Sequence, residues 1–420
     1  MAIHEFFLML AVLLLTARLF GELASRLGAP SVIGELLAGL VLGPSVLGWV
    51  QPTETLMTLA EVGIILLLFE VGLDTNLFRL AEAGRKPFVV AAVGAFLPLV
   101  LGFAAGWLLF DTSILAALFI GGTLTATSIG ITVRVLDDLM RRRSDEAQIV
   151  IGAAVIDDIL GVIILAFLYD FSSPKGVSLA STASIALFIV VFMVLAPIAG
   201  KIIAWAIDHT DRKLESEGLL ITLVISLIML FSWLAHAVGA PAIMGGFAAG
   251  IALSQHFRMS ITQRLRLPFR RTLERAFASR PELTHRLEKQ FRPLLHTYTP
   301  IFFVMVGVSL DLSAVDWSSA RVWLMAGVLV VLAVAGKVAS GWFIAEPTLR
   351  RAAIGLSMVP RGEVGLIFAK LGLGAAILSQ ELYAVLLIVV ALSTLLPPFA
   401  LKAFYQRYGD RPELAMRDDD

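Results

Sequence analysis

The chain has 420 residues, of which 58% are hydrophobic and 16% are charged. Soluble domains carry about 25% charged residues, so the composition excludes an ordinary soluble protein and predicts a membrane protein. The formal net charge is zero, which gives no support to a nucleic-acid partner. The absence of cysteine excludes disulfides, thiolate metal sites and cysteine nucleophiles.

About thirteen apolar segments along the chain have the length needed to cross a bilayer. Their limits are 5–24, 31–50, 53–71, 87–109, 114–135, 149–169, 180–207, 218–236, 241–255, 294–310, 322–345, 350–373 and 380–404. No basic region precedes the first segment, so we expect a retained helix there rather than a cleaved signal peptide. The pattern predicts an all-α, polytopic membrane protein.

Basic residues are concentrated in the loops that follow odd-numbered segments. These loops contain Arg26, Arg79, Arg85, Lys86, Arg141, Arg142, Arg143, Arg212, Lys213, the stretch 258–292, Arg350 and Arg351. Cytoplasmic loops are the ones enriched in lysine and arginine. We therefore expect the N-terminus outside the cell and the C-terminus, with a short tail over 406–420, in the cytoplasm.

An internal repeat relates the two halves of the chain. The residues of Gly28-Ala29-Pro30, Gly34 and Ala38-Gly39 recur at one constant offset as Gly239-Ala240-Pro241, Gly245 and Ala249-Gly250. Farther along, Val71-Gly72-Leu73-Asp74 is echoed by Val308-Ser309-Leu310-Asp311. An odd number of segments separates the copies, so the second copy crosses the membrane in the opposite sense. Inverted-topology repeats are typical of secondary transporters.

Segments at matching positions of the two halves contain interruptions, and we expect a broken helix in each. The first places Thr127 and Ser128 between glycines, and the second contains Pro360 and Gly362 beside Arg361 and Glu363. Proline removes a backbone donor and disturbs the preceding turn. Freed carbonyls and hydroxyls suit a hard cation, and Arg361 and Glu363 are expected to compensate the half-helix dipoles. For any single hydroxyl, ordinary helix packing is an equally good interpretation.

Three further ionisable residues lie deep in apolar segments. Asp157 and Asp158 occupy the middle of 149–169, where an ionised side chain costs at least ~2.5–3.5 kcal/mol. Lys337 lies too deep in 322–345 to reach the surface easily, so it needs a carboxylate partner. Consecutive helix residues point about 100° apart, which lets the two acids face different neighbours. We expect Asp158 to bind the cation and Asp157 to pair with Lys337. Spacing alone leaves the reverse assignment open, and a static structural ion pair is the alternative role for Lys337.

Together these motifs resemble those of the cation:proton antiporter-2 family, bacterial sodium/proton antiporters of the electrogenic type. The motifs are Ile156-Asp157-Asp158, Thr125-Ala126-Thr127-Ser128, Lys337 and Pro360-Arg361-Gly362-Glu363, and the resemblance spans roughly 5–405. It implies exchange of Na⁺ for protons, with Li⁺ as a second candidate cargo and with Na⁺ held by Asp158, Asp157 and Thr127. It also implies a transporter rather than an enzyme, with no cofactor.

The resemblance further implies a homodimer in the bacterial inner membrane, working by an elevator-like movement. The scaffold and dimerisation helices are expected at 1–76 and 218–310, and the mobile core at 87–170 and 320–405. The helix at 180–207 is expected to link them. Within the scaffold range, the basic stretch 256–293 is predicted to be a cytoplasmic loop. Its mixture of arginine, leucine and phenylalanine suits anionic lipid, although a solvated connector is the simpler interpretation.

Other functions fit the residues less well. An ion channel does not need an inverted repeat that contains a titratable site. An organic-anion symporter is expected to have a larger polar cavity. An intramembrane aspartyl protease needs acids that face each other from different helices, which adjacent residues cannot do. Exchange of K⁺ for protons stays open because selectivity among Na⁺, K⁺ and Li⁺ depends on cavity geometry.

Overall fold

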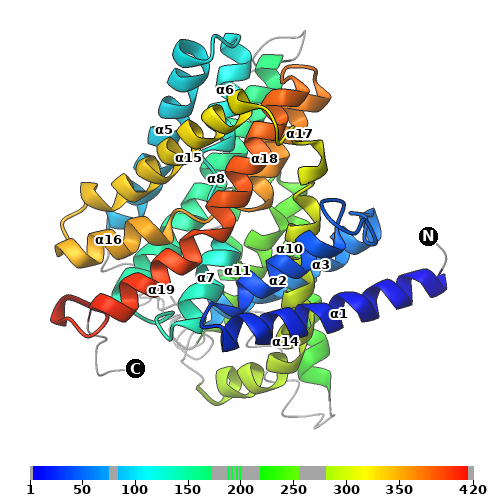
Figure 1. The fold of residues 1–420 in the computed structure, drawn as a ribbon. Helices are drawn as coiled ribbons and strands as arrows, with labels where there is room; N and C mark the ends of the chain where they lie inside the picture. The colour runs from blue at the N-terminus through cyan, green and yellow to red at the C-terminus, as the bar shows by residue number, and fades with distance from the viewer. Residues whose placement is uncertain are drawn as a thin grey trace. The chain divides into compact units, whose positions relative to one another are not determined.

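The computed structural model describes residues 3–74, 84–172, 187–189, 191–192, 195–196, 198–199, 218–254 and 281–414. Within these ranges every regular element is a helix, and seven helices are long and apolar enough to cross a bilayer (Figure 1). Four more apolar helices are 10–17 residues long. The expected segment 180–207 lies largely outside the described residues. The prediction of an all-α, polytopic membrane protein is confirmed.

The helices belong to two compact units, each assembled from distant parts of the chain. The first unit covers Met1–Ala60, Ala83–Thr182 and Pro300–Asp420, and the second covers Glu61–Glu82 and Ala183–Thr299. Helices wholly in the first are α1 (Ile3–Arg26), α2 (Ser31–Leu42), α5 (Lys86–Ala104), α6 (Ile114–Thr123), α7 (Ile129–Asp138), α8 (Asp145–Ser172), α15 (Ala320–Ser340), α16 (Thr348–Ser357), α17 (Glu363–Gly374), α18 (Gln380–Leu395) and α19 (Pro397–Tyr408). The second holds α10 (Leu219–Ala237) and α11 (Ala242–Leu253), while α3 (Glu54–Asp74) and α14 (Pro281–Ser309) contribute to both.

A tight turn joins α1 to α2 and lays the two helices side by side (Figure 1). Gly28 has a φ of 77°, a left-handed conformation that glycine adopts without strain, and Pro30 directly precedes α2. A Cβ on Gly34 would lie 2.0 Å from the carbonyl oxygen of Phe20, so the two backbones touch. Glycine at this position is what permits the contact.

The pair α10–α11 repeats the same construction. Gly239 has a φ of 84°, Pro241 precedes α11, and a Cβ on Gly245 would lie 2.3 Å from the Phe231 carbonyl oxygen. These residues occupy the positions that the internal repeat assigns to Gly28, Pro30 and Gly34. The sequence repeat is therefore a structural repeat.

The two copies of the repeat exchange packing partners. A Cβ on Gly39 of α2 would lie 1.9 Å from the Val304 carbonyl oxygen of α14, and one on Gly250 of α11 would lie 2.1 Å from the Phe69 carbonyl oxygen of α3. Because α3 and α14 are themselves equivalent in the repeat, each short helix packs against a helix from the other copy. Each compact unit thus contains parts of both halves of the chain.

A second pair of equivalent contacts lies in the first unit. A Cβ on Gly121 of α6 would lie 2.4 Å from the Leu99 carbonyl oxygen of α5, and one on Gly355 of α16 would lie 2.3 Å from the Val338 carbonyl oxygen of α15. Close backbone contact through small residues is the usual way that membrane helices associate. These contacts hold α6 and α16, the helices that precede the two interruptions.

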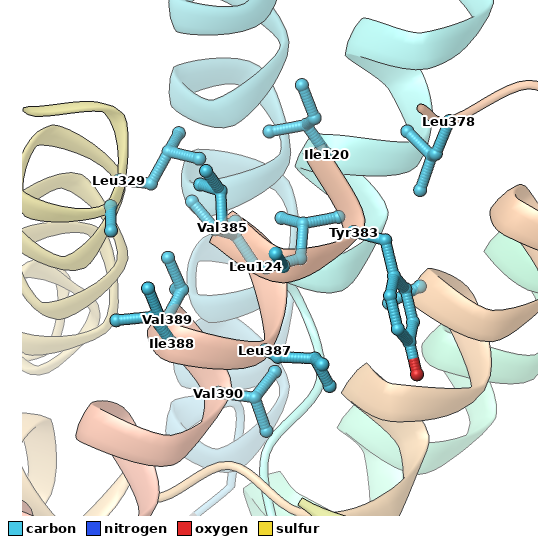
Figure 2. Close-up of a cluster of buried hydrophobic side chains, with 14 of the residues drawn as sticks. Ile120, Leu124, Leu329, Leu378, Tyr383, Val385, Leu387, Ile388, Val389 and Val390 are labelled. Carbon is cyan, nitrogen blue, oxygen red and sulfur yellow. The ribbon is translucent and has the colours of Figure 1, made fainter. Parts of the chain in front are cut away.

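A buried apolar cluster packs beside the interruptions. It includes Ile120 and Leu124 at the end of α6, Leu329 of α15, and Val385 and Val389 of α18 (Figure 2). These side chains are fully buried, so the ends of the broken helices are fixed by packing as well as by hydrogen bonds.

Two expected boundaries are wrong. The segment 31–50 is helical only to Leu42, because Gly43 precedes Pro44 and adopts an extended conformation. The basic loop expected at 256–293 is already helical from Pro281, where α14 begins. Leu287, Phe291 and Leu295 recur every fourth residue there and are buried, which makes this part of α14 amphipathic. The remaining residues of that loop, from 256 to 280, lie outside the described residues.

We predict that Gly34→Ala and Gly245→Ala each destabilise the protein by about 1–3 kcal/mol, because the added methyl group forces two touching backbones apart. The measurement is the thermal midpoint of the detergent-solubilised protein, followed by size-exclusion chromatography after heating. Gly327→Ala is the matched control, since no atom lies within 4 Å of its would-be Cβ. Equal midpoints for all three variants would contradict the close contact.

Candidate functional site

Two interrupted helices meet inside the first unit. Helix α6 ends at Thr123 and α7 begins at Ile129, while α16 ends at Ser357 and α17 begins at Glu363. The backbone N–H of Ser128 donates a hydrogen bond to the Pro360 carbonyl at 2.8 Å, which joins one interruption to the other. Both expected helix breaks are confirmed.

The contact between the interruptions depends on a glycine. A Cβ on Gly362 would lie 2.7 Å from the Ser128 side-chain oxygen, so a larger residue would push the interruptions apart. Ser128 is the N-cap of α7, and its hydroxyl oxygen accepts a long hydrogen bond of 3.5 Å from the Ile131 N–H. The hydroxyl of Ser128 therefore caps the start of α7 at the crossing of the two interruptions.

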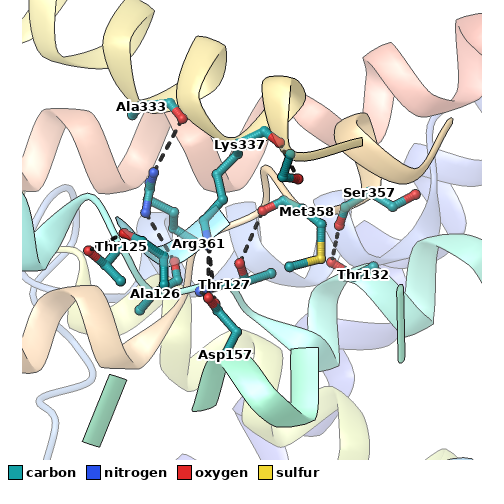
Figure 3. A network of polar contacts seen from close by, with 12 residues as sticks. Thr125, Ala126, Thr127, Thr132, Asp157, Ala333, Lys337, Ser357, Met358 and Arg361 are labelled. Carbon is teal, nitrogen blue, oxygen red and sulfur yellow. Dashed lines mark hydrogen bonds and ion pairs between the residues drawn. The ribbon is translucent and has the colours of Figure 1, made fainter. Parts of the chain in front are cut away.

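A fully buried ion pair lies beside the crossing (Figure 3). Lys337 Nζ of α15 is 3.1 Å from Asp157 Oδ2 and 3.2 Å from Oδ1 of α8. The backbone N–H of Thr127 donates to Asp157 Oδ2 at 2.9 Å. In the structure Lys337 thus pairs with Asp157, and Thr127 ties this pair directly to the first interruption.

Asp158 follows on the same helix and has a different environment. Its residue is 8% exposed, compared with 1% for Asp157. The two adjacent acids therefore differ in environment: Asp157 is paired with Lys337, and Asp158 is the more exposed of the two.

Arg361 fills the space between the interruptions and α15. Its guanidinium donates to the carbonyl oxygens of Ala126 at 3.0 Å and of Thr123 at 3.5 Å, and to that of Ala333 at 3.5 Å (Figure 3). Thr123 is the last residue of α6, where the helix dipole concentrates partial negative charge. This geometry fits the expected compensating role. Glu363 is the first residue of α17, and its side chain is outside the described atoms.

The chain matches known transport proteins over nearly its whole length. The model of the transmembrane sodium/hydrogen exchanger family matches residues 10–406. The chain belongs to this family. It is 35% identical to the Na⁺/H⁺-K⁺ antiporter GerN of Bacillus cereus, over 95% of the chain and 96% of that protein. It is 31% identical to the high-affinity Na⁺/H⁺ antiporter NhaS3 of Synechocystis, over 95% of the chain and 89% of that protein.

A solved structure shows the same fold. The sodium proton antiporter MjNhaP1 of Methanocaldococcus jannaschii superposes with a TM-score of 0.66 at 16% identity, covering 96% of this chain and 97% of that one. The resemblance inferred from the motifs is confirmed at the level of the family, whose members are transporters.

The candidate site includes three residues that the motifs did not indicate: Thr132, Ser357 and Met358. The hydroxyl of Thr127 donates to the Met358 carbonyl at 3.1 Å, and that of Thr132 donates to the Ser357 carbonyl at 2.9 Å. Thr132 lies one helical turn after Ser128, a spacing that could have drawn attention to it. The accepting carbonyls of Ser357 and Met358 carry no sequence signal, because any residue has one.

The arrangement brings together hard oxygen atoms and fixed charges in an apolar interior. Two carboxylates, hydroxyls and backbone carbonyls supply the oxygen ligands that hard cations such as Na⁺ prefer. Asp157, Lys337, Thr127 and Arg361 lie in one hydrogen-bonded network, and Asp158 adjoins it on α8. Such a site can exchange a cation for a proton without covalent chemistry.

We predict that Arg361→Met lowers the stability of the folded protein, because buried carbonyls lose their donor at about 1–3 kcal/mol for each group left unsatisfied. Arg361→Lys should lose less, since it keeps the positive charge near the end of α6. Thermal midpoints in detergent measure both effects. Arg321→Met is the control, because Arg321 is 67% exposed and its ion pair with Glu381 is long, at 3.8 Å. A midpoint for Arg361→Met that matches this control would show that the carbonyls do not depend on Arg361.

Proposed function

We propose that the chain exchanges Na⁺ for protons by alternating access, with Asp158 as the group for which the two cargoes compete. One observation carries this assignment: the carboxylate of Asp157 is engaged by Lys337 and by the backbone of Thr127. Asp158 is the adjacent and more exposed acid. Thr127, Ser128 and Asp157 complete the proposed cation site.

Competition for one carboxylate makes the exchange obligatory. An ionised side chain inside the membrane is costly, so the empty site resists crossing the barrier. Binding of either a proton or Na⁺ neutralises Asp158 and allows the site to move. Because the same oxygens serve both, one cargo must leave before the other binds.

The ion pair supplies a route to electrogenic exchange. Lys337 is completely buried, and its charge depends on the acids beside it. When Na⁺ binds at Asp158, the added positive charge favours release of a proton from Lys337. Each cycle then moves more than one proton per cation and responds to the membrane potential.

The proposed moving part is the core formed by 87–170 and 320–405, carried past a scaffold of 1–76 and 218–310. The residues of the proposed site lie on α8 and α15 and in the two interruptions, 124–128 and 358–362, all of which belong to the core ranges. The proposed linker, 180–207, lies largely outside the described residues. Helix α1 exposes Phe7, Leu15 and Leu19, an apolar face that suits lipid or a second copy of the chain.

We further propose a homodimer in the bacterial inner membrane, with the N-terminus outside and the C-terminus cytoplasmic. The bacterial relatives and the positions of the basic loops support this placement. Exposed Arg286, Lys289 and Arg292 of α14 lie within the stretch proposed to meet anionic lipid. The transport needs no cofactor.

Exchange of K⁺ for protons is the second candidate. GerN, the relative at 35% identity, is named for both Na⁺ and K⁺. Dye-quench assays in proteoliposomes, with Na⁺, Li⁺ and K⁺ added in turn at a clamped membrane potential, decide between the cations.

We predict that Asp158→Asn abolishes exchange, because an amide cannot alternate between a proton and a cation. The measurement is Na⁺ uptake driven by a pH gradient in proteoliposomes. Asp137→Asn is the matched control, since the side chain of Asp137 at the end of α7 is 49% exposed. Na⁺ uptake by Asp158→Asn at the wild-type rate would show that Asp158 is not the group for which Na⁺ and protons compete.

We also predict that the double variant Asp157→Asn, Lys337→Gln still exchanges but no longer responds to voltage. Removing both charges together avoids leaving either member of the ion pair buried without the other, and it takes away the proposed second proton carrier. The measurement is the exchange rate at two membrane potentials, each set by a potassium gradient in the presence of valinomycin. A voltage response equal to that of the wild type would contradict the role of Lys337.

A further inference from the structure

Glu35 is a buried carboxylate that the proposed exchange does not use. It lies in the short apolar helix α2 and is 2% exposed. On one side it faces α1, where a Cβ on Gly21 would lie 3.6 Å from Glu35 Cγ. On another, Glu35 Oε1 is 3.7 Å from Arg134 Nη2 of α7. Its second oxygen, Oε2, is buried without a hydrogen-bond partner.

The start of α2 is capped from another helix. The residue before α2 is Pro30, whose side chain makes no capping hydrogen bond. Both the backbone N–H and the hydroxyl of Ser31 donate to Asp138 Oδ2, at 2.9 and 2.8 Å. Arg134 adds a hydrogen bond to the Ser31 hydroxyl oxygen at 3.3 Å and lies 3.7 Å from Asp138. The last turn of α7 is therefore bonded to the first turn of α2.

The position of Asp138 suits α2 better than its own helix. Asp138 is the last residue of α7, where the helix dipole disfavours a negative charge. At the N-terminus of α2 the same charge is favourable. Contact with α2 therefore stabilises the negative charge of Asp138, and this stabilisation is lost when the two helices separate.

The second copy of the repeat has no such charges. By the offset that relates Gly34 to Gly245, Ser31 and Glu35 correspond to Ala242 and Gly246. By the offset that relates Gly121 to Gly355, Arg134 and Asp138 correspond to Phe368 and Gly372. The charged cluster is thus found at one end of the transporter and not at the position related to it by the inverted repeat.

We propose that Ser31, Glu35, Arg134 and Asp138 form a latch between α2 and α7 that is made in one end state of transport and broken in the other. The latch rests on the proposed function, in which α2 belongs to the scaffold and α7 to the moving core. It favours the state in which the end of α7 meets the start of α2. Lys402 of α19, also in the proposed core, donates to the Gly28 carbonyl in the α1–α2 turn and supports the same docking.

The latch must open in every cycle, so tying it shut must stop exchange. The chain contains no cysteine, which allows an introduced pair to be studied without background thiols. We expect Ser31→Cys, Asp138→Cys, once joined by oxidation or by a short bifunctional thiol reagent, to lose Na⁺/H⁺ exchange in proteoliposomes and to regain it with dithiothreitol. The control pair is Met57→Cys, Ser309→Cys, whose native side chains are 3.8 Å apart within the proposed scaffold. Joining that pair should leave exchange intact. Wild-type rates from fully joined 31–138 protein would overturn the latch.

A second measurement does not require transport. Adding Arg134→Gln to the single variant Ser31→Cys should speed labelling of the introduced thiol by a water-soluble maleimide about five- to tenfold, in the range of ordinary coupling free energies. The control is Arg321→Gln in the same background. Absence of exchange in the unmodified wild type would contradict the proposed function alone, whereas unchanged labelling with Arg134→Gln would contradict the latch.

Discussion

The structure depends on hydrogen bonds to the unpaired backbone groups at helix ends that are buried in an apolar interior. Each helix leaves backbone donors at its start and acceptors at its end, and lipid offers no water to satisfy them. At the crossing, α6 ends beside the guanidinium of Arg361, and α16 ends beside the hydroxyls of Thr127 and Thr132. One end is thus satisfied by a permanent charge and the other by neutral groups. The polar residues that line the two helix breaks are also residues of the proposed cation site.

This requirement also explains why the buried charges form one network. The backbone N–H of Thr127, freed by the interruption, donates to Asp157, and Asp157 holds Lys337. In the proposed exchange, a change in charge at Asp158 acts on Lys337, whose partner Asp157 is hydrogen-bonded to the first interruption. The electrical state of the site and the geometry of the broken helices are coupled through adjacent bonds rather than over a distance.

Much of this arrangement was accessible from the sequence, because proline, glycine and isolated charges in apolar segments have few interpretations. Pro360 and Gly362 located one interruption, and the need of Lys337 for a counter-ion located the ion pair. The end of α2 at Leu42 also had a local signal in Gly43-Pro44, which the long apolar run obscured. The spacing of Thr132 after Ser128 was a weak signal, but its partner Ser357 and the contact of Arg134 with Glu35 had none, since these contacts join residues far apart in the chain. Such contacts depend on how the helices pack, and no local pattern records that.

The exchanged packing of the repeat has a consequence for biosynthesis. Gly39 of α2 packs against α14, and Gly72 of α3 packs against α11. Both partner helices are synthesised much later than α2 and α3. Neither half can reach its final packing while it is the only part inserted, so helices must enter the bilayer first and find their partners afterwards. An ancestor with separate halves would have needed two chains to associate in this way. Once the halves were fused, separating them again would leave faces of close-packing glycine exposed to lipid.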